Sequence, residues 1–252
     1  MFKIATDKIA EWISFFSAIS KITDEVCLHV LEDRLWFRGM DPAHVSMIDF
    51  EVSKENFTEY ESEGETVACI LLEKPLSFIK KAKKGDKMEM VYEEKEGKLR
   101  VRVIGNYVKE FLVPLLDTVD RAPLKLPKVE FTSRIKMTTS AVKEALDDVK
   151  LVSEKVRVAT SEDSLQLRGE SDEGVEAAVT FSFHDIDILE TELKEKSVAT
   201  YNVELMSSIV KELEKVAGVV TFSYGTDLPL KLSFEFPERQ KFDFYLAPRI
   251  ED

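Results

Sequence analysis

The chain has 252 residues, 44% of them hydrophobic and 33% charged, and its formal net charge at pH 7 is −13. This composition supports one large or two small folded domains and excludes an intrinsically disordered chain. The negative charge argues against adhesion of the whole surface to nucleic acid, but it is compatible with a local basic stripe.

The cysteines and the N-terminal sequence indicate the compartment that we expect. Cys27 and Cys69 are far apart in the sequence and lie on apolar strand faces, which predicts reduced, buried thiols in a cytosolic protein. The chain opens with Met1-Phe-Lys-Ile4, without a charged-then-apolar leader, and no apolar run approaches about 18 residues. We therefore expect a protein that is neither secreted nor inserted in a membrane.

Hydrophobic periodicity predicts the elements of the first half in chain order. A helix capped by Thr6 or Asp7 comes first, because apolar residues recur at i, i+4, i+7 and i+10. Its apolar face consists of Trp12, Phe16, Ile19 and Ile22. A second helix begins at Glu73, where Pro75 fits the first turn. Alternating residues predict strands at 26–30, 35–37, 45–52, 87–92, 98–104 and 107–113.

The second half repeats this order at a shift of 130 residues. Glu32–Gly39 and Glu162–Gly169 are identical at five of eight positions, and a period this long indicates a duplicated domain rather than a solenoid. A helix capped by Thr139 or Ser140 precedes a second helix that starts at Glu204. The first of these helices has the apolar face Val142, Leu146, Val149 and Val152. Strands are expected at 156–158, 165–167, 175–183, 219–224, 230–236 and 242–246.

Together the two halves predict an α+β fold, in which each half carries an antiparallel sheet with two helices on one face. Between the halves, Leu116–Lys128 contains two prolines and mixed polarity, which is typical of an extended surface connector. We therefore expect an N-terminal repeat over residues 1–115, a connector over 116–130 and a C-terminal repeat over 131–252.

Sequence motifs for catalysis are absent. The chain has no phosphate loop, dinucleotide fingerprint, zinc-protease motif, closely spaced cysteine pair or nucleophile elbow. We therefore expect no catalytic residue, no metal site and no cofactor. A competing interpretation is a carboxylate-dependent hydrolase that uses Asp185 and Asp187, in an acidic segment that runs from His184 to Glu192. In a chain this acidic, the same segment is also expected as a solvated loop.

Lysines concentrate on or directly after the second predicted helix of the first half. They are Lys74, Lys80, Lys81, Lys83 and Lys84, and Lys211 and Lys215 lie on the matching helix of the second half. Lys80 with Lys84, and Lys211 with Lys215, are four residues apart and would share a helix face. Such a face either contacts a phosphate backbone or is an ordinary solvated surface.

Two segments are more apolar than their positions predict. Met40–Met47 is a loop interrupted by proline, and Phe244–Ile250 is a C-terminal tail. Apolar loops and tails are either packed against the rest of the protein or offer a docking surface.

Three separated motifs carry a resemblance to a known family. They are Met40-Asp-Pro-Ala-His-Val-Ser-Met47, Asp227-Leu-Pro-Leu230 and Tyr245-Leu-Ala-Pro-Arg-Ile-Glu-Asp252. These motifs resemble the archaeal and eukaryotic DNA polymerase sliding clamp, the proliferating cell nuclear antigen (PCNA) family, and the match runs from end to end. The resemblance implies duplicated DNA-clamp domains in a head-to-tail trimeric ring, with helices lining the inside and a continuous sheet outside.

The resemblance also implies how subunits meet. Edge strand Tyr107–Val113 of one subunit would pair with Val175–Phe183 of the next, which removes two exposed edges. The interface residues would be Tyr107, Val108, Phe111, Val175, Ala177 and Val179. Whether the ring contains three copies of this chain or a mixture of related chains stays open.

By resemblance, the function is to encircle duplex DNA without sequence preference, to tether a DNA polymerase as its processivity factor and to dock replication and repair enzymes. The DNA-lining residues would be Lys80, Lys81, Lys84, Lys211, Lys215, Lys143 and Lys150. Positions that are often basic in the family instead carry Ile13, Ser14, Glu144 and Asp147. We therefore expect DNA contact to be uneven around the channel.

The family also implies a site for short apolar and aromatic peptides of its partners. Those partners would be a DNA polymerase, a clamp loader of the replication factor C type, a flap endonuclease and a DNA ligase. The site would comprise Met40, His44, Val45, Met47, Leu124, Leu126, Pro127, Phe131, Pro229, Tyr245, Leu246, Ala247, Pro248 and Ile250. The expected location is the cytoplasm, with the nucleoid, in an archaeon and the nucleus in a eukaryote. Besides the hydrolase, a ring-forming structural protein without a DNA role is the remaining alternative.

Overall fold

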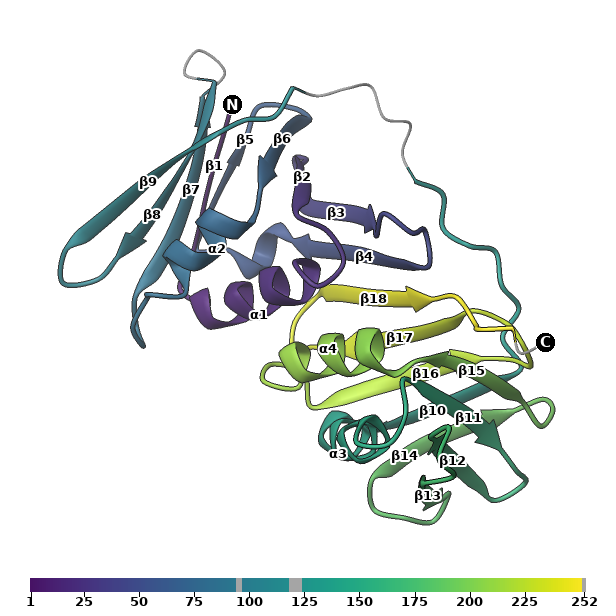
Figure 1. The fold of residues 1–252 in the computed structure, drawn as a ribbon. Coiled ribbons are helices and arrows are strands. Elements are labelled where there is room, and N and C mark those ends of the chain that lie inside the picture. Colours follow the sequence, from purple (N-terminus) through teal and green to yellow (C-terminus); the bar gives the residue numbers. More distant parts are fainter. Residues whose placement is uncertain (94–96, 118–123, 251–252) are drawn as a thin grey trace. The chain divides into compact units, whose positions relative to one another are not determined.

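The computed structural model describes residues 1–93, 97–117 and 124–250, which form two compact units. Unit 1 comprises Met1–Pro42, Ile48–Leu124 and Pro237–Lys241, and unit 2 comprises Ala43–Met47, Lys125–Phe236 and Phe242–Asp252. Residues 118–123 of the predicted connector and the last two residues of the third motif lie outside the described residues. Figure 1 shows the order of the elements along the chain.

Unit 1 contains two antiparallel sheets. The first has the order β5-β1-β7-β8-β9, and the strands of the second that lie in this unit have the order β4-β3-β2-β6. Buried and accessible residues alternate along β1, β2, β3 and β8, as in β8, where Leu99, Val101 and Val103 are buried. The bounds are β1 Phe2–Thr6, β2 Glu25–Val30, β3 Arg34–Met40, β4 Ser46–Ser53, β5 Glu59–Ser62, β6 Thr66–Leu71, β7 Lys87–Glu93, β8 Lys98–Ile104 and β9 Val108–Pro114.

Helix α1 (Ile9–Ile19) supplies an aromatic side of the unit 1 core, and α2 (Glu73–Ile79) is shorter. Trp12 is 5.3 Å from Phe16 and 5.9 Å from Phe50, measured between ring centroids. The four residues of the predicted apolar face are all buried. The predicted cap is wrong, because Lys8 is the N-cap and Thr6 Oγ1 instead accepts a hydrogen bond from the Lys8 amide.

Unit 2 repeats the same arrangement. Its sheets have the orders β14-β10-β16-β17-β18 and β13-β12-β11-β15, which match the two orders of unit 1 strand for strand. The bounds are β10 Ser133–Thr138, β11 Lys155–Thr160, β12 Ser164–Glu170, β13 Glu176–Ser182, β14 Ile188–Leu193, β15 Val198–Asn202, β16 Val219–Tyr224, β17 Leu230–Glu235 and β18 Gln240–Leu246. The α+β class, the duplication and the antiparallel sheets predicted from the sequence are therefore confirmed.

Helices α3 (Thr139–Lys150) and α4 (Val203–Leu213) pack against each other in unit 2. Val142, Leu146 and Val149 of α3 are fully buried, as their spacing predicts. The cap prediction fails again, since the N-cap is Thr138, whose hydroxyl donates to Asp187 Oδ1 at 2.6 Å. Within the described ranges, no helix is long and apolar enough to cross a membrane.

The cysteine prediction is wrong. Cys27 of β2 and Cys69 of β6 are directly opposite in the antiparallel pair and form a disulfide, with their Cα atoms 3.9 Å apart. The two residues are separated by 42 positions, and the pairing register that brings them together is not visible in the sequence. The chain therefore has no free cysteine, and the inference of a reducing compartment from its thiols no longer holds.

Candidate functional surfaces

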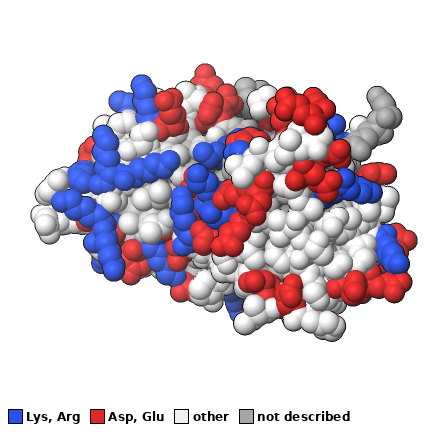
Figure 2. All heavy atoms as spheres, turned by 60° about the horizontal axis from the view of Figure 1, so that its bottom comes forward, with Lys and Arg blue, Asp and Glu red and all other residues white. Residues whose placement is uncertain are grey.

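Exposed lysines of unit 1 cluster at the C-terminal end of α2. Lys80, Lys81 and Lys84 are exposed, and within residues 1–93, 97–117 and 124–250 none of the three pairs with a carboxylate. Figure 2 shows Lys and Arg side chains gathered at the left of the view, the side on which Figure 1 draws α2 and β7–β9. Positive charge without local partners is what a phosphate backbone requires.

Lys80 and Lys84 do not share a helix face, contrary to the prediction from their spacing. Helix α2 ends at Ile79, and the chain turns directly afterwards, where Asp86 Oδ2 accepts a hydrogen bond from the Lys83 amide at 2.9 Å. The lysines therefore project from a helix terminus and its following turn, not from one face of a helix.

The lysines of unit 2 are mostly paired with acidic residues. Lys143 Nζ is 3.0 Å from Asp147 Oδ2, Lys150 pairs with Glu204, and Lys215 pairs with Glu212. The hydrogen bond to Asp147 raises the pKa of Lys143. Lys211 is exposed and, among the residues that the structure describes, has no carboxylate partner. The exposed side of α3 thus carries little uncompensated positive charge.

In unit 2 the apolar loop and the C-terminal tail lie next to each other. The Ala247 amide donates to the Val45 carbonyl at 2.8 Å, and the Arg249 amide donates to the Thr200 carbonyl at 2.7 Å. These two hydrogen bonds hold the tail against the loop and against β15. The two segments that looked anomalous in the sequence therefore form one surface.

The side chains of this surface differ in exposure. Val45 is 41% exposed and Ile250 is 84% exposed, whereas Met47 and Leu246 belong to the core beneath. Tyr245 is nearly buried, with the Lys231 ammonium 5.7 Å from its ring centroid. The remaining predicted members in unit 2, namely His44, Leu126, Pro127, Phe131, Pro229, Ala247 and Pro248, are exposed or half-buried. Met40 and Leu124 belong to unit 1.

Two backbone positions in these motifs are unusual. His44 has φ 57° and Asp227 has φ 54°, and among the described residues they are the only non-glycine residues with positive φ. Left-handed backbone is uncommon for such residues and concentrates at binding and catalytic sites. Both fall inside segments that the sequence had singled out.

The connector is held to unit 1 at two places. The Leu116 amide donates to the Cys69 carbonyl at 2.8 Å, and the Leu124 carbonyl accepts a hydrogen bond from Arg38 Nη1 at 2.7 Å. Arg38 was not among the predicted site residues. Its partner lies 86 positions away, so no local pattern could have identified this contact.

Each unit ends one sheet in an accessible strand. Among the strands that the structure describes, β9 pairs with β8 alone and β13 pairs with β12 alone. On these edges Tyr107, Val108 and Val175 are 62%, 61% and 51% exposed, while Phe111, Ala177 and Val179 are half-buried. Unpaired edges with apolar side chains are templates for pairing with another chain.

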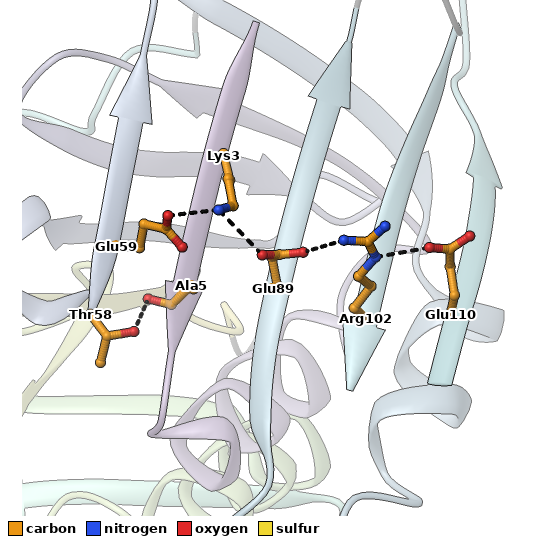
Figure 3. A network of polar contacts seen from close by, with 7 residues as sticks. All are labelled: Lys3, Ala5, Thr58, Glu59, Glu89, Arg102 and Glu110. Carbon is orange, nitrogen blue, oxygen red and sulfur yellow. Dashed lines mark hydrogen bonds and ion pairs between the residues drawn. The ribbon is translucent and has the colours of Figure 1, made fainter. Parts of the chain in front are cut away.

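A row of alternating charges crosses all five strands of the sheet that ends in β9 (Figure 3). Lys3 bonds to Glu59 at 2.6 Å and reaches Glu89 at 3.6 Å. Arg102 contacts Glu89 at 3.0 Å and Glu110 at 2.8 Å, and hydrogen bonds to Glu110 and Glu89 raise its pKa. Because the row ends at Glu110, it reinforces the attachment of the edge strand to its sheet.

The acidic segment near His184 has local roles. Asp185 Oδ2 accepts from the Ser182 amide at 2.7 Å, and Asp187 Oδ1 accepts from Thr138 Oγ1. No group of three or more His, Cys, Asp or Glu residues suited to a metal ion occurs in the part of the chain that the structure describes. Both carboxylates are thus engaged in hydrogen bonds within their own unit.

Comparisons with known proteins agree over the whole length of the chain. The family model described as Rad9 matches residues 14–239. A DNA polymerase sliding clamp of Thermofilum pendens is 29% identical over 251 residues, covering 100% of both chains, and that of Nitrosopumilus maritimus is 31% identical over 94% of each. The PCNA crystal structure from Thermococcus kodakaraensis superposes with a TM-score of 0.92 at 25% identity, covering 99% of this chain and 100% of that one. A PCNA2–PCNA3 complex of Sulfolobus tokodaii gives a TM-score of 0.90 at 24% identity over the same shares.

Proposed function

This chain belongs to the Rad9/PCNA family of DNA sliding clamps, and from that membership we propose that it encircles duplex DNA and tethers a DNA polymerase. The full-length duplication carries this proposal, because two equivalent units per chain are the building blocks of a closed ring. Retention on DNA then comes from ring closure, and tight contacts are unnecessary. The relatives are clamps, so the hydrolase and the ring without a DNA role lose their support.

We propose that the ring closes through the two accessible edges. Strand β9 of one subunit would add to β13 of the next, through the exposed Tyr107, Val108 and Val175 together with Phe111, Ala177 and Val179. The stacking of Phe78 on Phe111, with ring centroids 5.2 Å apart, supports this edge by fixing one of its apolar side chains. We likewise propose an N-terminal repeat over residues 1–115, a connector over 116–130 and a C-terminal repeat over 131–252.

We propose that DNA meets the ring mainly through Lys80, Lys81, Lys84 and Lys211. These four lysines have no carboxylate partner among the described residues, so their charge is available to phosphates. Lys143, Lys150 and Lys215 are already engaged by acidic neighbours and would contribute less. Contact with DNA would therefore be uneven, and the sliding ring would touch the duplex loosely.

We propose that partner peptides dock on the surface formed by the loop and the tail. Val45 and Ile250, which are exposed on this surface, offer apolar contacts for an aliphatic and aromatic motif. A polymerase, a clamp loader of the replication factor C type, a flap endonuclease and a ligase are the partner classes that such a platform serves. We propose no catalytic activity, and we place the protein with chromosomal DNA, in the cytoplasm or nucleus according to the cell.

The oligomeric state of the purified chain tests the ring. Light scattering after size exclusion is expected to give three times the chain mass of 28.8 kDa. Phe111→Asp should shift the mass to that of a single chain, because a charge on the edge strand cannot be buried in the interface. Exposed Leu151, which is remote from both edge strands in sequence, provides the control variant Leu151→Asp, which should stay trimeric. A single-chain mass for the unmodified protein at all concentrations, with or without related chains, would refute a ring built on these edges.

A further inference from the structure

Arg38 of β3 links the connector to the sheet of unit 1. Its Nη1 atom donates to the Leu124 carbonyl at 2.7 Å. Leu124 stands two residues before Leu126 and three before Pro127, and all three belong to the peptide site that the family resemblance implies. The contact therefore fixes Leu124 on unit 1, directly before these residues in the sequence.

The guanidinium of Arg38 is itself held in place by a buried carboxylate. Nε and Nη2 both contact Asp49 Oδ1, at 2.9 Å and 2.8 Å, and the Asp49 side chain is only 7% exposed. Asp49 Oδ2 also pairs with Lys241, so the carboxylate has partners on both oxygens. Because a guanidinium is a rigid planar fork, fixing one edge of it fixes the direction of the remaining N–H groups.

An aromatic pair packs beside the same guanidinium. The Arg38 Cζ atom lies 5.9 Å from the Trp36 ring centroid, and His29 stacks on Trp36 with centroids 3.8 Å apart. These contacts further restrict the Arg38 side chain. The donor that meets Leu124 is thus oriented before any partner arrives.

We propose that Arg38 is a positioning residue for partner-peptide binding, which acts by anchoring the connector through the Asp49–Arg38–Leu124 link. This inference rests on the proposed peptide site. A connector held in place by Arg38 loses less conformational freedom when a peptide pairs with it, and the peptide therefore binds more tightly. Without the link, the peptide would have to order the connector itself.

Two variants at Arg38 separate positioning from folding. Arg38→Gln removes the hydrogen bond to Leu124 and the positive charge opposite Asp49. Arg38→Lys keeps the charge, but its single ammonium group lacks the planar guanidinium that bonds Asp49 and Leu124 at once. The matched control is Arg34→Gln on the same strand, where the arginine pairs with the exposed carboxylates of Asp33 and Glu51. The melting temperature of each variant reports whether it folds.

The first measurement is hydrogen exchange in the peptide-free ring. Amides of Lys125, Leu126 and Lys128 should exchange at least about threefold faster in both Arg38 variants and unchanged in Arg34→Gln. The second measurement is calorimetric titration with a synthetic peptide that ends in an aromatic pair. Both Arg38 variants should bind about five- to tenfold more weakly, which corresponds to about 1–1.4 kcal/mol.

The outcomes distinguish this inference from the proposed function. If the unmodified ring does not bind the peptide, the peptide site fails, while the exchange measurement still tests the anchor. Unchanged exchange and affinity in Arg38→Lys would overturn the inference. Weaker binding with unchanged exchange would also overturn it, because Arg38 would then contact the peptide and not the connector.

Discussion

Some lysine side chains that the structure describes in the two units form ion pairs with carboxylates, and others do not. Lys80, Lys81 and Lys84 stand at the end of α2 without such a partner among the described residues, whereas Lys143 is bonded to Asp147 four residues along α3. The sequence showed where lysines gather, but not which of them are neutralised. Pairing depends on side-chain geometry, so the uneven basic surface emerges only in the structure.

Charge reversal at the free lysines should therefore matter more than at a paired one. Lys80→Glu combined with Lys84→Glu should lower clamp-dependent polymerase processivity at least about threefold and reduce the salt slope of DNA association by about 0.9 per lost phosphate contact. Primer extension on loaded circular templates at several salt concentrations measures both quantities.

The matched control for this prediction is Lys143→Glu, which should have a smaller effect because Asp147 already occupies that lysine. Peptide affinity should be unchanged in all of these variants. Loss of peptide binding in the double variant would indicate misfolding, and equal effects of the paired and unpaired lysines would contradict the assignment.

At the scale of the elements, the sequence predicts strand positions well and helix ends poorly. Periodicity located β8 and β16 to the residue, because one buried face fixes an alternating pattern. The spacing of Lys80 and Lys84 predicted that the helix continues through both residues, but α2 ends at Ile79. Lysine is compatible with a helix and with a turn, so the sequence did not mark this end. The helix caps were misplaced by one or two residues, which is the usual uncertainty of helix ends.

Contacts between residues that are far apart in the chain could not be predicted from the sequence. The Cys27–Cys69 disulfide follows from the register of β2 against β6, and Arg38 meets Leu124 across 86 positions. The motifs Met40–Met47 and Tyr245–Asp252 did identify the loop and tail that share a surface. Their contact, through Val45 and Ala247, required the fold.

The disulfide should contribute measurably to the stability of unit 1. A cross-link that closes a loop of 42 residues restricts the unfolded chain, and the loop-entropy model gives a contribution of about 4 kcal/mol. Cys27→Ser combined with Cys69→Ser should therefore lower the free energy of unfolding by about 2–4 kcal/mol. Urea unfolding with and without a reducing agent measures the change.

The same experiment contains its own control. A reducing agent should destabilise the unmodified protein and leave the double serine variant unaffected. If the reducing agent has the same effect on both, or thiol titration of the native protein finds two free cysteines, the disulfide is not the state in solution.

At the scale of the whole molecule, the duplication makes the two units alike in fold, and the proposed docking surface lies where they differ. The two units share both sheet orders strand for strand, which suits them as repeated segments of a ring. Unit 2 alone contains the Ala43–Met47 loop and the tail, so the proposed docking surface occurs once per chain. The free edges β9 and β13 likewise occur once each, one in each unit, as head-to-tail closure requires.

Topological retention tests the central claim most directly. The ring is loaded onto nicked circular DNA by its clamp loader, separated from free protein, and challenged with a restriction enzyme that cuts the circle once. A sliding clamp should stay on intact circles in high salt and leave through the ends within minutes of linearisation, and blocking both ends with bound protein should restore retention. Equal retention on circular and linear DNA, or complete release from intact circles in high salt, would contradict the account, because the protein would then hold DNA by contact and not by encirclement.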